Sequence, residues 1–285
     1  MESGIKSGIE TGGKSVVKAV NGNENEKRLL FLSFYPDLMN LYGGYANLLI
    51  LRRLMERLGR AVTVREITPG ETPDLSDLSQ ADFVFMGAGT ERRQKFAMDD
   101  FIRYSDLIKN LAADDTPMLF SGNSMELCGK NITTADGEIY HGIGLAGFET
   151  VQRARRITGD VYGYMNHIPG DSENTAETPY RIQIVGFMNK SGIISGVETP
   201  LLNILDMGFG NEFEKGPEGF QIKNIIGSEL TGPILVKNPC ILEKIAAAIF
   251  TRRGLPLPDE WPIDPWARNG YDVTVRELDA RCHKR

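Results

Sequence analysis

The stretch "RLLFLSFYPDLMNLYGGYANLLILRRLMERLG", residues 28–59, decides the fold. It opens with a continuous apolar run at residues 28–35, as expected for a strand buried on both faces. After a Pro-Asp turn, apolar side chains recur at helical spacing and a glycine is placed to end the helix. These positions are Leu51, Leu54, Met55, Leu58 and, at the end, Gly59. A buried strand followed by an amphipathic helix is the opening of a parallel sheet with helices on both faces.

The same alternation continues through the first half of the chain. Further strands are predicted at residues 61–67, 81–87 and 117–121. Between the last two, "KFAMDDFIRYSDLIKNLAADD" (95–115) predicts one amphipathic helix that turns four side chains inward. Those side chains are Phe96, Phe101, Leu107 and Leu111. The fold class is therefore α/β, with a mostly parallel sheet flanked by helices.

From about residue 134 the pattern changes to short strands joined by turns, which predicts a β-rich second half. The stretch "NPCILEKIAAAIFTRRG" (238–254) predicts a final helix, with Asn238 as its cap and Pro239 at its first position. We expect a disordered tail over residues 1–27, a single domain over 28–254, and a C-terminal extension over 255–285. The Pro/Trp-rich extension is expected to be a surface wrap or a flexible end.

Composition excludes several classes of function. A net charge of −6 argues against nucleic acid as the main partner, and no apolar run approaches the roughly 20 residues of a membrane span. The polar N-terminus lacks the apolar centre of a signal peptide, so we expect a cytoplasmic protein. Three cysteines without pair spacing and three histidines predict neither a disulfide framework, nor a metal site, nor a cofactor.

A glycine motif in the middle of the chain matches a dinucleotide-binding pattern but lacks the structural context that the pattern needs. "GIGLAG" (142–147) fits the G-x-G-x-x-G pattern of dinucleotide-binding folds. That pattern needs a strand directly before it and a helix opening from it, so that the helix N-terminus can hold a pyrophosphate. A turn stands close before the motif and no clear helix follows. We therefore expect a loop.

The first stretch continues into a longer block that identifies a family. "FYPDLMNLYGGYANLLILRRLMERLG" (34–59) closely resembles the opening of the GatD-type amidotransferases, in the CobB/CobQ-like branch of the class I glutamine amidotransferases. The resemblance covers roughly residues 28–250. It implies the flavodoxin-like sandwich of the class I amidotransferases and a cysteine nucleophile served by a histidine base.

A second block resembles the family's oxyanion loop, G-G-G-Q-D-x-x-Q. In "MGAGTERRQ" (86–94), Gly87, Ala88, Gly89 and Gln94 hold that frame, while Thr90 and Glu91 replace Gln and Asp. The resemblance makes the backbone of Ala88 and Gly89 candidates for binding an anionic oxygen, because glycine-rich backbone can approach such an oxygen closely.

The strand-turn-helix elbow expected in "TPMLFSGNSMELCGKN" (116–131) departs from the family. Aligned to the family's C-G-G-Y-Q-L-L-G, "GNSMELCG" places Gly122 at the nucleophile, Asn123 beside it and Glu126 at the glutamine. Glycine has no side chain and cannot attack an amide. Cys128 lies six residues later, over one and a half turns along a helix, and is expected to be a small buried residue.

The base is also missing. "GSELTGPILVKNP" (227–239) resembles the family's G-T-Y-L-H-G-P-I-L-x-K-N-P, with Thr231 in the place of histidine. In "GFMNKSGII" (186–194), Met188 and Lys190 replace the family's glutamate and histidine. "RRITG" (155–159) maps the family's glutamine-binding arginine to Arg156, which is equally well a plain surface residue. Arg156 and Lys190 would suit a carboxylate ligand in the elbow pocket, whereas Glu126 would oppose one.

Three hypotheses follow. The leading one is a degenerate amidotransferase-like subunit without glutaminase activity, retaining at most a small carboxylate or glutamine ligand. The resemblance implies a partner for it, since GatD works with MurT, a Mur-ligase-like enzyme, to amidate lipid II. The second is an active amidotransferase with relocated residues, using Ser121 or Ser124 with His141 or His167. The third is a different hydrolase or transferase on the same scaffold.

Overall fold

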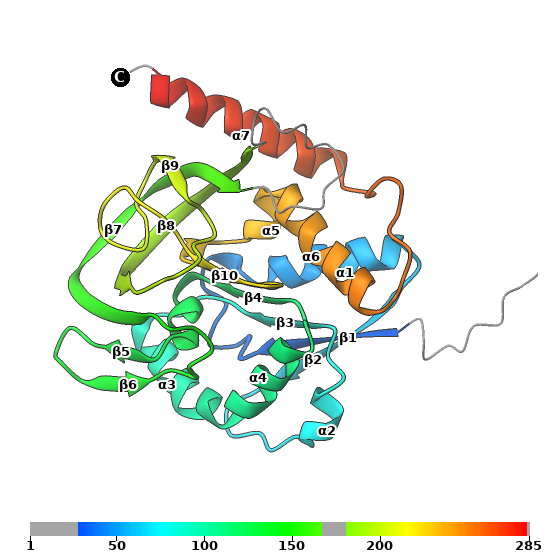
Figure 1. The fold of residues 1–285 in the computed structure, drawn as a ribbon, viewed down its shortest axis with the longest axis horizontal. Helices are drawn as coiled ribbons and strands as arrows, with labels where there is room; N and C mark the ends of the chain where they lie inside the picture. Colours follow the sequence, from blue (N-terminus) through cyan, green and yellow to red (C-terminus); the bar gives the residue numbers. More distant parts are fainter. Residues whose placement is uncertain (1–27, 167–180, 284–285) are drawn as a thin grey trace, which may run out of the picture.

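The computed structural model describes residues 28–166 and 181–283, which form two sheets with helices packed around them (Figure 1). The expected tail over residues 1–27 and His167 lie outside the described residues. Among the helices described, none is long and apolar enough to cross a membrane.

The first sheet has six strands in the order β10-β11-β4-β3-β1-β2 and is parallel except for β10. Its strands are β1 (Arg28–Phe34), β2 (Ala61–Ile67), β3 (Phe83–Met86), β4 (Met118–Ser121), β10 (Phe220–Ile222) and β11 (Ile225–Ser228). The strands predicted from residues 28, 61, 81 and 117 onward are thus confirmed. Parallel strands place their carboxyl ends along one edge, so the turns after β3 and β4 lie side by side.

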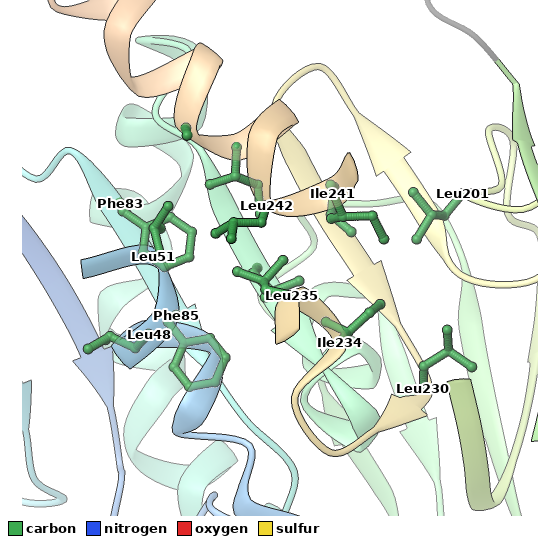
Figure 2. Packing of buried hydrophobic residues seen from close by; sticks show 14 of the residues in the cluster. Leu48, Leu51, Phe83, Phe85, Leu201, Leu230, Ile234, Leu235, Ile241 and Leu242 are labelled. Carbon is green, nitrogen blue, oxygen red and sulfur yellow. The ribbon is translucent and has the colours of Figure 1, made fainter. Parts of the chain in front are cut away.

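Helices cover both faces of this sheet, and the side chains of each strand alternate between them. Phe31, Phe83 and Phe85 pack with helices α1 and α6, and Figure 2 shows Phe83 and Phe85 beside Leu48 and Leu51. Phe34 and Phe120 pack with α3 and α4 on the other face. The helices are α1 (Ala46–Arg57), α2 (Leu75–Leu78), α3 (Glu91–Phe101), α4 (Ser105–Ala113), α5 (Ile234–Lys237) and α6 (Pro239–Arg252). Short 3-10 turns lie at η2 (Leu41–Gly43) and η3 (Ile102–Tyr104).

The second sheet is the predicted β-rich half. Its order is β12-β8-β7-β5-β6, with β9 paired to β7, and most of its pairs are antiparallel. Its strands are β5 (Asn131–Thr133), β6 (Ile139–His141), β7 (Glu149–Asn166), β8 (Arg181–Ser195), β9 (Ile204–Met207) and β12 (Leu230–Thr231). The "GIGLAG" stretch is the loop between β6 and β7, as expected.

The C-terminal stretch contains a helix that its composition did not predict. Helix α7 (Pro265–His283) lies along β7 and β8, where Leu278 packs on Tyr162 and Val185 (Figure 1). The hydroxyl of Tyr271 also donates to the carbonyl of Gln183, at 2.8 Å. Both contacts hold α7 against the second sheet.

Two local predictions were wrong. The single helix over 95–115 is α3 and α4 joined by a 3-10 turn, and Phe96 is 57% exposed. The buried face of α3 runs through Gln94, Ala97, Met98 and Phe101, which puts Phe96 on the opposite side. Asn238 stands at the N-cap position of α6, with Pro239 next as predicted, but its side chain makes no capping hydrogen bond: its amide pairs with the backbone N–H and C=O of Val185 on β8, at 2.8 and 2.9 Å.

Candidate functional site

The turn after β4 is a sharp elbow at Gly122. Ser121 still has strand geometry, with φ −110° and ψ 139°, and Gly122 then turns to φ +64°. The next seven residues form the 3-10 helix η4 (Gly122–Cys128) in place of the α-helix suggested by the sequence. Residues with a side chain rarely adopt this left-handed conformation, so glycine suits the position.

The structure brings together three positions that the sequence placed in separate blocks. A Cβ added to Gly122 would lie 3.9 Å from Cγ2 of Thr231 and only 2.5 Å from Cβ of Ala88. The elbow therefore faces the residue at the family's histidine position. The methyl group of Ala88 takes up the space that a nucleophile's own Cβ would need.

Thr231 provides no base at this point. Its hydroxyl donates to the backbone carbonyl of Phe187 on β8, at 3.0 Å, and the residue is buried. A hydroxyl bound in this way is a donor to the sheet. It also lacks the near-neutral pKa that makes histidine an efficient proton acceptor.

The glycine loop after β3 keeps the close backbone packing of an oxyanion loop, but the backbone N–H of Gly89 already has a hydrogen-bond partner. A Cβ on Gly87 would lie 2.4 Å from the backbone oxygen of Met39, so this position needs glycine. The N–H of Gly89 donates to Oδ1 of Asn123, at 2.9 Å. An oxyanion hole needs such an N–H free to meet the developing charge. Asn123 therefore occupies a donor that a reacting substrate would require.

Arg156 is likewise bound to the protein itself. Its guanidinium forms an ion pair with Glu91 and donates to Oδ1 and the backbone carbonyl of Asn189, both at 2.9 Å. Burial acts to raise the pKa of Glu91, but its own backbone N–H, the Ser191 hydroxyl and the charge of Arg156 together lower it. Glu91 is thus ionised at neutral pH and takes the place that a ligand carboxylate would fill.

These internal contacts leave almost no space over the elbow. The cavity there, lined by Tyr42, Ala88, Gly89, Asn123, Arg156 and Thr231 among others, has a volume of about 10 Å³. That is about the room needed for one water molecule. In this arrangement the elbow has no room for an amino acid such as glutamine.

A buried cluster of charged groups lies beside the elbow. Its members, Glu126, Lys190, Glu218 and Glu229, are each at most 2% exposed. Glu126 accepts from the amides of Gln94 and Gln152, at 2.7 and 2.9 Å. Lys190 donates to two backbone carbonyls, those of Gly210 and Asn211, each at 2.6 Å. Lys190 therefore holds a loop and is not free to bind an anion in the pocket.

Burial decides the protonation of this cluster. It raises the pKa of Glu126 and Glu229, and the negative charge of Glu126 raises that of Glu229 further. Burial raises the pKa of Glu218 to about 7, against hydrogen bonds from the backbone of Glu229 and the hydroxyl of Ser228. Sequence reasoning missed Glu218 and Glu229 as site residues, although Glu229 stands in the "GSELTGPILVKNP" block (227–239) that resembles the family. Because the cluster is sealed, its shifted pKa values do not by themselves mark a reactive site.

Among the described residues of the serine hypothesis, Ser124 and His141 are not arranged as a nucleophile and base, and His167 lies outside the described residues. The hydroxyl of Ser124, fully buried, donates to the carbonyls of Met86 and Ser121, at 2.9 and 3.0 Å. His141 lies on the exposed β6 and pairs with Asn131.

Burial raises the pKa of the Cys128 thiol well above its usual value, so it is not a thiolate. Over residues 28–166 and 181–283, no group of three metal-ligating side chains is arranged to hold a metal ion.

Comparison with known proteins supports the resemblance seen in the sequence. The profile of the CobB/CobQ-like glutamine amidotransferase domain matches residues 32–239. The lipid II isoglutaminyl synthase (glutamine-hydrolyzing) subunit GatD of Staphylococcus aureus is 30% identical over 228 residues, covering 80% of this chain and 87% of that protein. The same subunit of Streptococcus pneumoniae is 30% identical over 222 residues, covering 77% and 79%. Among solved structures, PurLQS from Thermotoga maritima aligns with a TM-score of 0.48 and 12% identity, covering 80% of this chain and 97% of that one.

Proposed function

Because the chain belongs to the CobB/CobQ-like glutamine amidotransferase family, we propose that it is an amidotransferase-like subunit that does not hydrolyse glutamine. The observation that carries the proposal is the elbow: Gly122 lies near Thr231, and the methyl group of Ala88 occupies the space that a Cβ at position 122 would need. Glutamine hydrolysis by this route needs a thiolate and a base that receives its proton. Losing both members of such a pair costs many orders of magnitude in rate.

The other contacts at the elbow support the same proposal. The Gly89 N–H is bound by Asn123, and Arg156 is bound by Glu91. A substrate would have to displace both partners and open a cavity of about 10 Å³. We therefore propose that the site is closed and that its polar groups are bound to other residues of the protein. In this proposal the site has lost the ability to bind its substrate as well as its nucleophile.

The relatives indicate the setting in which such a subunit would work. The GatD proteins of S. aureus and S. pneumoniae are subunits of a lipid II isoglutaminyl synthase. We propose that this chain serves a complex of that kind in the cytoplasm, bound to a Mur-ligase-like subunit that amidates a cell-wall precursor. In this proposal residues 28–254 form the domain common to the family, and residues 255–285 are an extension.

The proposal makes two claims: the chain binds a ligase-like subunit, and it does not supply that subunit with ammonia from glutamine. Reconstitution of the complex tests each claim separately. The chain is purified together with a Mur-ligase-like protein of the same organism, and amidation of the precursor is measured with either ammonium chloride or glutamine as nitrogen donor. We expect a stable complex that amidates with ammonium and not with glutamine. Amidation driven by glutamine would contradict the loss of hydrolysis, whereas failure to form a complex would contradict the role as a subunit.

A further inference from the structure

A second cavity, far larger than the one over the elbow, lies between α3, the β5–β6 hairpin and β7. Its volume is about 470 Å³, within the range of small-molecule sites. Helix α3 lines it with Glu91, Gln94, Lys95 and Met98, which share one face of the helix. The Glu91–Arg156 ion pair lines both cavities, so the two cavities are neighbours.

Part of the cavity lining is apolar. It includes Met98 and Ile132, each 3% exposed to solvent, and Leu127, which is 0% exposed. The amides of Gln94 and Gln152 stand beside them, and both are already bound to Glu126. An apolar part of a ligand would therefore meet hydrocarbon here without stripping water from an unpaired polar group.

The cavity lining carries four cations, Arg92, Lys95, Arg153 and Arg156, against the three carboxylates of Glu91, Asp136 and Glu138. Within the part of the chain that the structure describes, neither Arg92 nor Arg153 makes an ion pair. The other two cations have partners, since Lys95 pairs with Glu138 and Arg156 with Glu91. Two unneutralised guanidinium groups beside one hollow are unexpected in a chain with a net charge of −6.

The backbone of β7 is irregular at this cavity. Its pairing with β8 shifts register between Gln152 and Ile157, and this interval contains the lining residues Arg153, Ala154 and Arg156. A bulge of this kind re-aims side chains that a regular strand would send to alternate faces, and bulges concentrate near binding sites. The bulge thus brings Arg153 and Arg156, both on β7, to the same cavity.

We propose that this cavity binds a small organic anion that carries a carboxylate, phosphate or sulfonate on an apolar body. The anionic group is held by Arg92 and Arg153, and the apolar body lies against Met98, Leu127 and Ile132. Free glutamine does not fit this description, because its side-chain amide would lie against the apolar part of the cavity. The site borders the elbow cavity, with which it shares Glu91, Arg156 and Ser191, but it does not depend on the proposed function.

The test uses the full chain and the dye anilinonaphthalene sulfonate, which joins a sulfonate to an apolar aromatic body. Binding is followed by fluorescence and by calorimetry. Arg153→Gln and Arg92→Gln remove the two free guanidinium groups, and Arg155→Gln is the matched control, because it makes the same charge change in the same bulge at a residue that does not line the cavity. Phenylnaphthylamine, which lacks the sulfonate, reports on the apolar part alone.

We expect saturable binding of the dye at one site, weakened about tenfold by Arg153→Gln or Arg92→Gln, as for the loss of one charge-assisted contact. Arg155→Gln is expected to leave binding within about twofold, and none of the three variants to change the binding of phenylnaphthylamine. The proposal is overturned if the dye binds all four proteins equally, if Arg155→Gln weakens binding as much as Arg153→Gln, or if no saturable site is found. Thermal unfolding of each variant confirms that the folded protein is being measured.

Discussion

Replacing Gly122 with cysteine restores the side chain that the family uses as its nucleophile, and we expect this change to destabilise the protein. The new Cβ would lie 2.5 Å from Cβ of Ala88, about 1 Å inside ordinary carbon–carbon contact. The methyl group of Ala88 is fixed to the backbone and cannot rotate away. Cysteine would also have to adopt the φ of +64° that glycine adopts here.

The two effects can be given magnitudes. Overpacking of a buried site costs about 1–3 kcal/mol, and a left-handed backbone costs a residue with a side chain about 1–2 kcal/mol. Gly122→Cys should therefore lower the free energy of unfolding by about 2–5 kcal/mol. Ala88→Gly alone should cost less than about 1 kcal/mol, through the greater freedom of the unfolded chain. The double variant should recover the free energy of unfolding that overpacking removes. The coupling energy between the two positions is therefore expected to be about 1–3 kcal/mol.

The assay is urea unfolding at neutral pH with reductant, applied to the wild type, both single variants and the double variant. Gly43→Cys serves as the control, because Gly43 has a similar φ of +69° and an added Cβ would meet nothing within 4 Å. It isolates the backbone cost and should show no coupling to Ala88→Gly. If the losses from Gly122→Cys and Ala88→Gly simply add, within about 0.5 kcal/mol, then Ala88 does not fill the nucleophile's space and the reasoning fails.

Three further changes test other parts of the structure by the same unfolding assay. Burial holds the Glu218 pKa at about 7 in the folded protein, against the usual 4.5, so its proton is bound more tightly in the folded state and stability should fall as pH rises from about 4.5 to 7. Glu218→Gln should flatten that fall by up to about 3 kcal/mol, and an unchanged slope would contradict the assignment. Asn238→Ala removes three buried hydrogen bonds and should cost about 3 kcal/mol, whereas a loss of only about 1 kcal/mol would fit a simple helix cap. Glu91→Gln breaks a half-exposed ion pair and should cost less than about 1 kcal/mol; a loss above 2 kcal/mol would show that the pair is structurally essential.

Much of the fold could be predicted because its signals are local. The apolar run of β1 and the helical spacing of α1 each lie within a dozen residues, and the structure confirms both elements. Phe96 shows where this reasoning stops. It belongs to an apolar stretch, but the inward face of α3 is set by packing against the sheet, which the spacing in the sequence does not contain.

The site depends more strongly on distant contacts. The alignment of sequence blocks pointed to Gly122 and Thr231 separately, and only the fold brings the two positions together, with a Cβ added at Gly122 3.9 Å from Cγ2 of Thr231. Glu91 and Arg156 are 65 residues apart, and no pattern within either block indicates that they pair. Asn238 has the sequence context of a helix cap, yet its amide matches the backbone of β8, an element more than 40 residues earlier in the chain.

The central claim, that the elbow no longer hydrolyses glutamine, is tested most directly by ammonia release from glutamine. The purified chain is assayed alone and together with any ligase-like protein that co-purifies, with Cys128→Ala as a control for the remaining thiol near the elbow. We predict no ammonia above the buffer level in any of these samples. Clear turnover by the wild-type chain that survives Cys128→Ala and disappears with Ser121→Ala or Ser124→Ala would contradict the account and establish a serine-based site.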